Sequence, residues 1–245
     1  MQYDLERGFI MKIRMAELNI EIQNRYPYLE TICKDYLADF DRADISVVVG
    51  ETEIADEIIR STLQTPPTPG YAEAIAVFRS IALQLPRFDA FVFHAAVVEY
   101  QGKGYAFSAP SGTGKTTHVR LWQQLLGDRA TIINGDKPIF RFMGGKLLAF
   151  GSPWCGKERM QVNRSVPLSA ISFIERAASN SIKPIDHAET LLRLYSQVIM
   201  PTKRDDAMIF LDLLDRMVQV IPTYVLSCNK DSEAAVVALR GMKGE

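Results

Sequence analysis

The chain has 245 residues, of which 47% are hydrophobic and 23% charged, and its 28 basic side chains nearly balance its 29 acidic ones for a formal charge of -1. A chain of this length can bury a substantial core, and it fits one large α/β domain or one such domain with a small addition. The balanced charge provides no net field that would attract nucleic acid or an acidic membrane, so neither is expected as a partner.

The amino-terminal part of the chain predicts a small layer of strands and helices. Residues 10–22 mostly alternate between apolar and polar side chains, which indicates a half-buried strand. Residues 29–40 have apolar side chains at helical spacing, residues 45–49 form a β-branched run typical of a strand, and residues 53–63 are again helical in pattern. This order predicts a βαβ-type, α+β layer, which either recognises an acceptor or packs against the main sheet.

The strongest interruption in the pattern is the segment TPPTPG at residues 65–70. Its prolines and glycine disfavour both helical and ladder hydrogen bonds, so a linker or a sharp crossover is expected there. We therefore place the small layer at residues 1–66 and the main domain at residues 67–245, with one continuous domain as the alternative.

The main domain is predicted to be mixed α/β. Two strands at residues 91–100 and 104–109 flank the turn-like Gln101-Gly102-Lys103, which favours an antiparallel hairpin. The other expected elements are a helix at 71–85, a helix at 115–126, strands at 131–134, 138–142, 147–150 and 170–175, helices at 189–198 and 206–218, a strand at 223–227 and a helix from 232.

Residues 108–117 read SAPSGTGKTT and stand directly between a predicted strand and a predicted helix, which is the context of a P-loop. Glycines at 112 and 114 let backbone N–H groups turn inward, and the amino end of the following helix adds its positive dipole, so the loop can hold phosphate oxygens. Lys115 would reach the β- and γ-phosphates, and the Thr116 hydroxyl would ligate Mg²⁺. The predicted nucleotide-binding residues of this loop are Pro110, Ser111, Gly112, Thr113, Gly114, Lys115, Thr116 and Thr117.

The loop departs from the usual GxxxxGK[ST] pattern at one position, where Ala109 replaces the first glycine. The alternative interpretation is a glycine-rich turn that caps an ordinary helix and leaves Lys115 in solvent.

Two further polar residues are candidates for the same site. Asp136 follows the strand at 131–134, so its carboxylate is expected to point toward the bound metal and act as a second Mg²⁺ ligand or as a general base. Asn-Gly-Asp is also a good β-turn sequence, which is the structural alternative. His94 interrupts an apolar strand that the hairpin brings beside the P-loop strand, so it can orient the acid or the phosphate, or be a core histidine with satisfied hydrogen bonds.

The segment GSPWCGK at residues 151–157 is a candidate functional loop, because two glycines bracket an exposed-looking Trp-Cys pair and Lys157 can meet a phosphate. The alternative is an ordinary connection with Trp154 packed in the core. Cys155 is not expected to be a nucleophile, since phosphoryl transfer needs no covalent intermediate and no partner base is evident.

The cysteines and the first residues favour a cytoplasmic protein. Cys33, Cys155 and Cys228 are odd in number and far apart, which matches neither a zinc site nor a disulfide framework. Residues 1–15 carry acids and lack the apolar stretch of a secretory signal, and no segment approaches the roughly 18 apolar residues of a membrane span.

Taken together, the run His94-Ala95-Ala96-Val97-Val98, the glycine hairpin, the P-loop and Asp136 resemble the catalytic domain of bacterial HPr kinase/phosphorylase, within the P-loop proteins shaped like phosphoenolpyruvate carboxykinase. The resemblance is clear over residues 91–150 and extends to residue 227 only in the order of elements. It implies a mixed-sheet P-loop kinase domain, with Asp136 as the acid that deprotonates a serine hydroxyl and His94 as the histidine beside it. Where that family has a second acid, this chain has Lys137, and stand-alone serine kinases encoded with peptide-modification genes are more similar to it than true HPr kinase.

The expected function is therefore transfer of the γ-phosphate of ATP, with Mg²⁺, to a serine-type hydroxyl of a peptide or protein. The catalytic residues would be Asp136, Lys115 and His94, and Lys157 would be an additional nucleotide contact. The alternatives are a kinase for a small molecule such as free serine or a sugar, and a nucleotide-binding regulator without catalysis. A homo-oligomer remains open.

Overall fold

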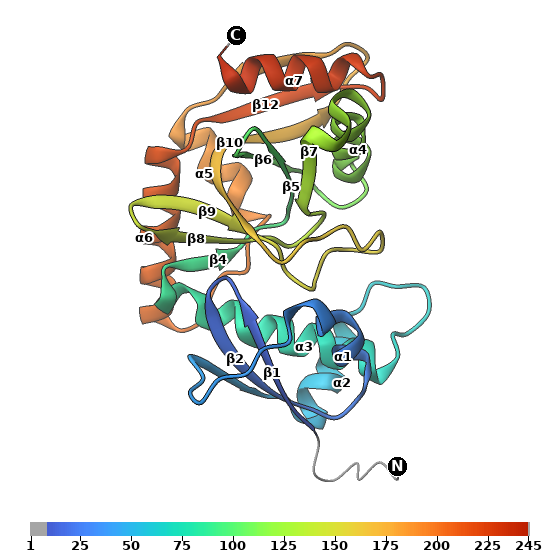
Figure 1. Ribbon diagram of the computed structural model, residues 1–245, viewed down its shortest axis with the longest axis vertical. Helices are drawn as coiled ribbons and strands as arrows, with labels where there is room; N and C mark the ends of the chain where they lie inside the picture. Colours follow the sequence, from blue (N-terminus) through green and yellow to red (C-terminus); the bar gives the residue numbers. More distant parts are fainter. Residues whose placement is uncertain (1–8, 245) are drawn as a thin grey trace. The chain divides into compact units, whose positions relative to one another are not determined.

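The computed structural model describes residues 9–244, and the chain divides after Gln84 into two units, each with its own sheet and helices (Figure 1). Residues 1–8, which belong to the stretch expected to lack a secretory signal and to the expected layer 1–66, lie outside the described residues. No helix within residues 9–244 is long and apolar enough to cross a membrane.

The described part of the first unit, residues 9–84, contains a three-stranded sheet and three α-helices. Strands β1 and β2 pair antiparallel, and β3 pairs parallel with β2. In chain order the elements are β1 (Phe9–Met15), β2 (Leu18–Asn24), α1 (Tyr28–Cys33), the single 3-10 turn η1 (Lys34–Tyr36), β3 (Ile45–Val48), α2 (Glu51–Arg60) and α3 (Pro69–Gln84). The expected βαβ arrangement is present in β2, α1 and β3.

The expectation of one strand over residues 10–22 is wrong, because the chain reverses there. Ala16 and Glu17 both have positive φ, 52° and 57°, which is the backbone conformation of a two-residue hairpin turn. The turn separates β1 from β2, and the alternating pattern that suggested one strand continues through both.

The boundary between the units lies after α3 and not at the proline-rich segment, because α3 is fastened to the first unit by two buried carboxylates. Glu73 of α3 accepts hydrogen bonds from the backbone N–H groups of Arg25 at 2.6 Å and Tyr26 at 3.0 Å. Arg79 of α3 donates two hydrogen bonds, of 2.6 and 3.1 Å, to Glu57 of α2. The TPPTPG segment therefore connects α2 to α3 within one unit.

Over its described residues, 85–244, the second unit is a mixed α/β fold with a nine-stranded sheet. The strand order is β4-β8-β9-β10-β6-β5-β7, with β12 beside β10 and β11 beside β12. Its elements are the 3-10 turn η2 (Leu85–Phe88), β4 (Ala90–Val92), β5 (Ala95–Tyr100), β6 (Lys103–Ser108), α4 (Lys115–Leu126), the 3-10 turn η3 (Gly127–Arg129), β7 (Ala130–Asn134), β8 (Ile139–Met143), β9 (Lys146–Phe150), β10 (Ser165–Arg176), β11 (Ser181–Pro184), α5 (His187–Tyr195), α6 (Arg204–Val220), β12 (Thr223–Cys228) and α7 (Glu233–Lys243). Among these, β11 was not expected from the sequence.

Strand β10 joins two parts of this sheet. Its first residues pair antiparallel with β9, and its later residues pair in parallel with β6 on one edge and β12 on the other. Parallel neighbours end at the same edge of a sheet, so the segments that follow β6, β10 and β12 lie close together.

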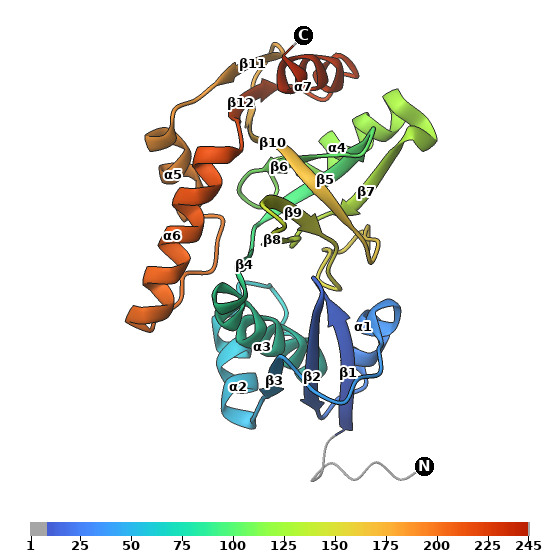
Figure 2. The ribbon, with the colours of Figure 1, turned by 60° about the vertical axis from the view of Figure 1, so that its left-hand side comes forward.

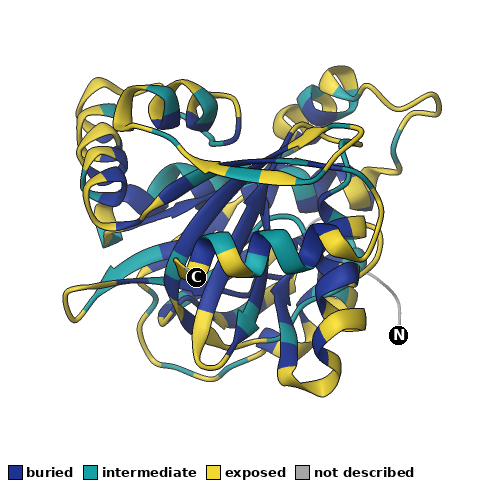
Figure 3. Cartoon of the chain, turned by 90° about the horizontal axis from the view of Figure 1, so that it is seen from above, coloured by how far each residue is buried: buried dark blue, intermediate teal, exposed yellow. Residues whose placement is uncertain are grey.

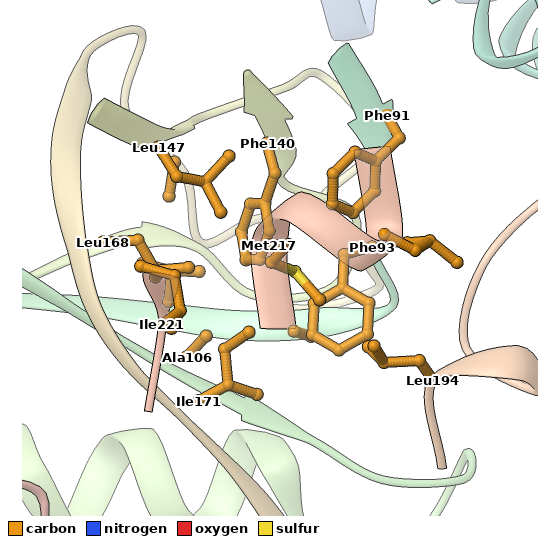
Figure 4. Packing of buried hydrophobic residues seen from close by; sticks show 14 of the residues in the cluster. Phe91, Phe93, Ala106, Phe140, Leu147, Leu168, Ile171, Leu194, Met217 and Ile221 are labelled. Atoms are coloured by element: carbon orange, nitrogen blue, oxygen red, sulfur yellow. The ribbon is translucent and has the colours of Figure 1, made fainter. Parts of the chain in front are cut away.

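Helices cover both faces of the sheet (Figure 2). Successive side chains of each strand point to opposite faces, so a strand contributes residues to a core on each side. In β5, Ala95 and Val97 belong to the core shared with α5 and α6, whereas Ala96 and Val98 belong to the core shared with α4 and α7. Figure 3 shows the central strands as buried and the outward sides of the helices as exposed. Figure 4 shows the first of these cores, in which the rings of Phe93 and of Phe140 of β8 lie near Met217 of α6.

Candidate functional site

The chain passes from β6 to α4 through a glycine loop, as the sequence predicted. Gly112 and Gly114 adopt φ values of 77° and 129°, which favour glycine for conformational reasons, since an added Cβ would meet nothing within 4 Å at either position. The Thr113 N–H donates to the Pro110 carbonyl at 3.2 Å, which tightens the loop. The amino end of the twelve-residue helix α4 begins directly after the second glycine.

Lys115 is buried at this helix start, with only 7% of its surface exposed, and its Nζ donates to the Ala109 carbonyl at 2.7 Å. Burial lowers the pKa of its ammonium to about 8, with Asp136 opposing the shift and Lys137 adding to it. The alternative of an ordinary helix cap would place the Lys115 side chain in solvent. The side chain is instead buried. A buried cation without a carboxylate in contact is costly, and an anion held by the loop would offset that cost.

A second cation, which was not among the residues predicted for the site, holds the loop from the end of β10. Arg176, the last residue of β10, donates through Nε to the Thr113 carbonyl at 3.1 Å and through Nη2 to the Gly112 carbonyl. The expected strand ended one residue earlier, and nothing local marks this arginine as a partner of residues that precede it by 63 and 64 positions.

His94 and Asp136 meet where the strand expected at residues 91–100 is interrupted. Strand β4 pairs with β8, whereas β5 pairs with β6 and β7, and His94 lies between them. Its Nε2 is 3.1 Å from Asp136 Oδ1, and its Nδ1 is 2.9 Å from Gln197 Oε1. The His94 N–H also donates to the Gln197 carbonyl at 2.8 Å, so Gln197 fixes both the backbone and the ring.

The turn that carries Asp136 is built on a buried asparagine. Asn134 Oδ1 accepts from the backbone N–H groups of Asp136 and Lys137, both at 2.8 Å, and its Nδ2 donates to the Ser152 carbonyl at 3.0 Å. The Ser152 hydroxyl donates to the Lys137 carbonyl at 2.6 Å. Asn134 and Ser152 are both fully buried. The Asn-Gly-Asp sequence is therefore a turn, and the same turn aims the Asp136 carboxylate at His94.

Opposing effects set the charge of Asp136. Burial raises the pKa of its carboxyl, but the hydrogen bond with His94 and the nearby ammonium groups of Lys137 and Lys115 outweigh burial and lower it. Lys137 Nζ lies 4.0 Å from Asp136 Oδ2, and burial lowers the pKa of that lysine while Asp136 opposes the shift. Asp136 is therefore a carboxylate at neutral pH, able to accept a proton or to bind a cation.

The segment 151–157 packs against this turn. Trp154 and Cys155 are 8% and 7% exposed, so the expectation of an exposed Trp-Cys pair is wrong and Trp154 is packed. Gly156 has a φ of 79°, and a Cβ there would lie 3.2 Å from the Asp136 Cβ. Burial raises the pKa of the Cys155 thiol, which keeps it protonated and poorly nucleophilic.

Lys157 is exposed, and its neighbours place it between the Asp136 turn and helix α4. The preceding Gly156 touches Asp136, and the following Glu158 pairs with Arg120 of α4. A contact between Lys157 and a phosphate stays a prediction.

Among residues 9–244 no three His, Cys, Asp or Glu side chains gather as a metal cluster. Mg²⁺ in nucleotide sites is held by one or two protein oxygens together with phosphates and water, so the pair predicted from the sequence, Thr116 and Asp136, needs no such cluster. Thr116 is half-buried next to Lys115, and Lys115 is close enough to Asp136 for each to shift the pKa of the other. These donors fit a magnesium–nucleotide complex.

Comparison with known proteins identifies a family and a distant structural likeness. The HPr(Ser) kinase/phosphatase from Coxiella burnetii is 7% identical, with 62% of this chain and 95% of that chain covered at a TM-score of 0.35, a value too low to carry an argument about function. No curated protein matches the sequence. The family model described as SynChlorMet cassette protein ScmC matches residues 72–232, more than half of the chain, and is a different family from the HPr kinases that the motifs resemble. The matched residues include the glycine loop, His94, Asp136 and Arg176, and the chain belongs to the SynChlorMet cassette protein ScmC family.

Proposed function

We propose that the protein is an ATP-dependent kinase that transfers the γ-phosphate to a serine-type hydroxyl of a peptide or protein. One observation carries the proposal: a buried lysine at the end of a glycine loop shares its surroundings with an ionised carboxylate that a histidine holds in place. A loop that binds phosphate and a base that can accept a hydroxyl proton are the two parts that phosphoryl transfer needs. We also propose that the second unit is a P-loop kinase domain of the HPr kinase and phosphoenolpyruvate carboxykinase type, on the strength of its motifs.

The proposed reaction needs positioning and electrostatic stabilisation more than covalent catalysis. The backbone N–H groups of the loop and Lys115 hold the phosphates. Asp136 accepts the proton of the incoming hydroxyl, whose oxygen forms a bond to the γ-phosphorus while the bond from that phosphorus to the bridging oxygen breaks and releases ADP. Thr116 and Asp136 would hold Mg²⁺, which neutralises charge on the phosphates when bound. His94 positions Asp136.

The acceptor has a candidate entry beside His94. A cavity of about 110 Å³ is lined by Val92, His94, Lys137, Ser196, Gln197, Val198 and Ile199. This volume suits a serine side chain of a peptide, and it equally suits a small acceptor such as free serine, which is the second candidate substrate.

The direct test uses ATP labelled in the γ-phosphate together with Mg²⁺ and a library of serine-containing peptides, and the product is identified by mass spectrometry. Label on a peptide supports the proposal, and label on free serine or a sugar added in a parallel reaction supports the small-molecule alternative. Binding of MgATP without transfer or hydrolysis would identify a regulator and overturn the kinase.

The contact between Gly156 and Asp136 provides a test with a matched control. Gly156→Ala and Gly145→Ala both place a side chain at a φ near 80°, at 79° and 75°, and each is expected to cost about 1–2 kcal/mol of unfolding free energy. Only Gly156→Ala presses on the Asp136 Cβ, because a Cβ at Gly145 meets nothing within 4 Å. The unfolding temperature should fall in both variants, at least as much in Gly156→Ala as in Gly145→Ala, and the rate of phosphate transfer should fall only in Gly156→Ala. If the two variants transferred phosphate at the same rate, the reaction would not depend on the position of the turn that carries Asp136.

The pH dependence of nucleotide binding is expected to follow Lys115. Its pKa of about 8 is raised when phosphate binds, because the phosphate favours the charged ammonium. Binding above pH 8 therefore takes up a proton, so the affinity for MgADP is full below pH 8 and falls by up to about tenfold per pH unit above it. Calorimetry in buffers of different ionisation enthalpy measures both the affinity and the proton uptake. Lys115→Arg, whose guanidinium stays charged, should abolish the dependence, and a flat wild-type profile through about pH 9 would contradict it.

A further inference from the structure

A larger cavity lies beside the glycine loop. The loop is the part of its wall that also takes part in the proposed reaction. It has a volume of about 240 Å³, and its walls come from the start of α4 and from the ends of β10 and β12. The lining residues are Thr113, Gly114, Thr117, His118, Ile174, Arg176, Ala177, Cys228, Asn229 and Lys230. The sequence predicted nucleotide contacts for Thr113, Gly114 and Thr117, but not for the other seven lining residues.

The position and size of this cavity limit what it can hold. Thr113, Gly114 and Thr117 belong both to the loop and to the cavity wall, so a group attached to a phosphate chain in the loop can enter the cavity directly. The volume is slightly below the range of about 300–1,000 Å³ that takes whole drug-sized ligands, which leaves room for a flat ring system but not for a complete nucleotide.

His118 is a buried wall residue with an unused donor. Only 2% of its surface is exposed. The Trp122 indole N–H, which can only donate, donates to His118 Nε2 at 3.1 Å. The single ring proton therefore sits on Nδ1, for which no acceptor exists among residues 9–244. A buried donor without a partner is rare and is characteristic of a place where a ligand supplies the acceptor.

Arg176 adds a flat cation to the same wall. Its guanidinium is fixed by the carbonyls of Gly112 and Thr113, so its orientation is set before any ligand arrives. Guanidinium groups stack on aromatic ring systems, and little side-chain entropy is lost when the group is already held. Ile174 and Ala177 provide apolar surface beside it.

We propose that this cavity takes the base of the bound nucleotide, an aromatic heterocycle that stacks near Arg176 and accepts a hydrogen bond from His118 Nδ1–H. The inference rests on the proposed function, because it requires the phosphates of the same molecule to occupy the glycine loop.

The experiment compares two ligands that share the phosphates and differ in the base. Calorimetry with MgADP and with magnesium pyrophosphate is carried out on the wild type, on Ala177→Phe and on Ala178→Phe. Ala177 is half-buried in the cavity wall, so a phenylalanine there fills the cavity, whereas the neighbouring Ala178 is exposed and outside it. Circular dichroism and thermal unfolding establish that both variants are folded.

The wild type is expected to bind MgADP at least about tenfold more tightly than pyrophosphate, which corresponds to about 1.4 kcal/mol. Ala177→Phe should remove that advantage and leave pyrophosphate binding unchanged, and Ala178→Phe should change neither. Equal wild-type affinities for the two ligands overturn the base site while leaving the glycine loop as a phosphate site. Failure of the wild type to bind either ligand overturns the proposed function as well. If Ala177→Phe does not fold, the wild-type comparison alone decides.

Discussion

Lys115→Ala is expected to reduce phosphate transfer by at least about 10²–10³-fold, the cost of removing one preorganised charge partner from a reacting group. Lys115 is the buried cation of the glycine loop. Its Nζ lies 2.7 Å from the Ala109 carbonyl, within the loop that is proposed to hold the phosphates. The same change should weaken MgADP binding. Initial rates with labelled ATP and calorimetry with MgADP measure the two effects.

A matched control separates this effect from a general loss of charge. Lys103 is the exposed first residue of β6, the strand that leads into the loop, so Lys103→Ala removes one positive charge without changing the loop. Its transfer rate should equal that of the wild type. Full turnover by Lys115→Ala would contradict the mechanism, whatever the control does.

Asp136→Asn is expected to lower the transfer rate by about 10²–10⁴-fold, the usual contribution of a general base. Asparagine keeps the shape of the side chain and can still hydrogen bond with His94, but its amide cannot accept the hydroxyl proton. The MgADP affinity should change much less than the rate, because the loop and Lys115 remain. The exposed Asp128 of η3 supplies the control Asp128→Asn.

The distance of 3.1 Å between His94 Nε2 and Asp136 Oδ1 leads to a prediction for the double variant. If His94 acts by positioning Asp136, then His94→Ala should slow transfer in the wild type and have little additional effect in Asp136→Asn, since residues that act as a unit are not additive. Transfer by Asp136→Asn at the wild-type rate would remove this aspartate from the chemistry and leave only a structural turn.

Local patterns predicted the elements around the site well, because those elements are defined by neighbouring residues. Helix α4 was expected at Lys115–Leu126 and lies there, since its apolar side chains recur at helical spacing between Gly114 and Gly127. The hairpin of β5 and β6 was likewise marked by its own turn. The hairpin turn at Ala16 and Glu17 was missed, because neither residue type favours positive φ.

The partners of the candidate site could not be predicted, because they come from distant parts of the chain. Gln197 contacts His94 across 103 positions, and Arg176 reaches the glycine loop across 63. The fold alone brings these residues together, through the break between β4 and β5 and the parallel pairing of β10 with β6. The role of Asn134 follows only from the two backbone N–H groups that it binds.

The long strand β10 also has a consequence for synthesis on the ribosome. One edge of β6 can pair with β5 as soon as both strands have been synthesised. The other edge pairs with β10, which is synthesised later and whose Leu168 aligns with Gly104 of β6. At about 5–20 residues per second, translation needs roughly 3–13 s to reach that partner. During this interval the nascent chain presents an apolar strand with an open edge, a template for self-association. Chaperone demand should therefore be highest before β10 emerges.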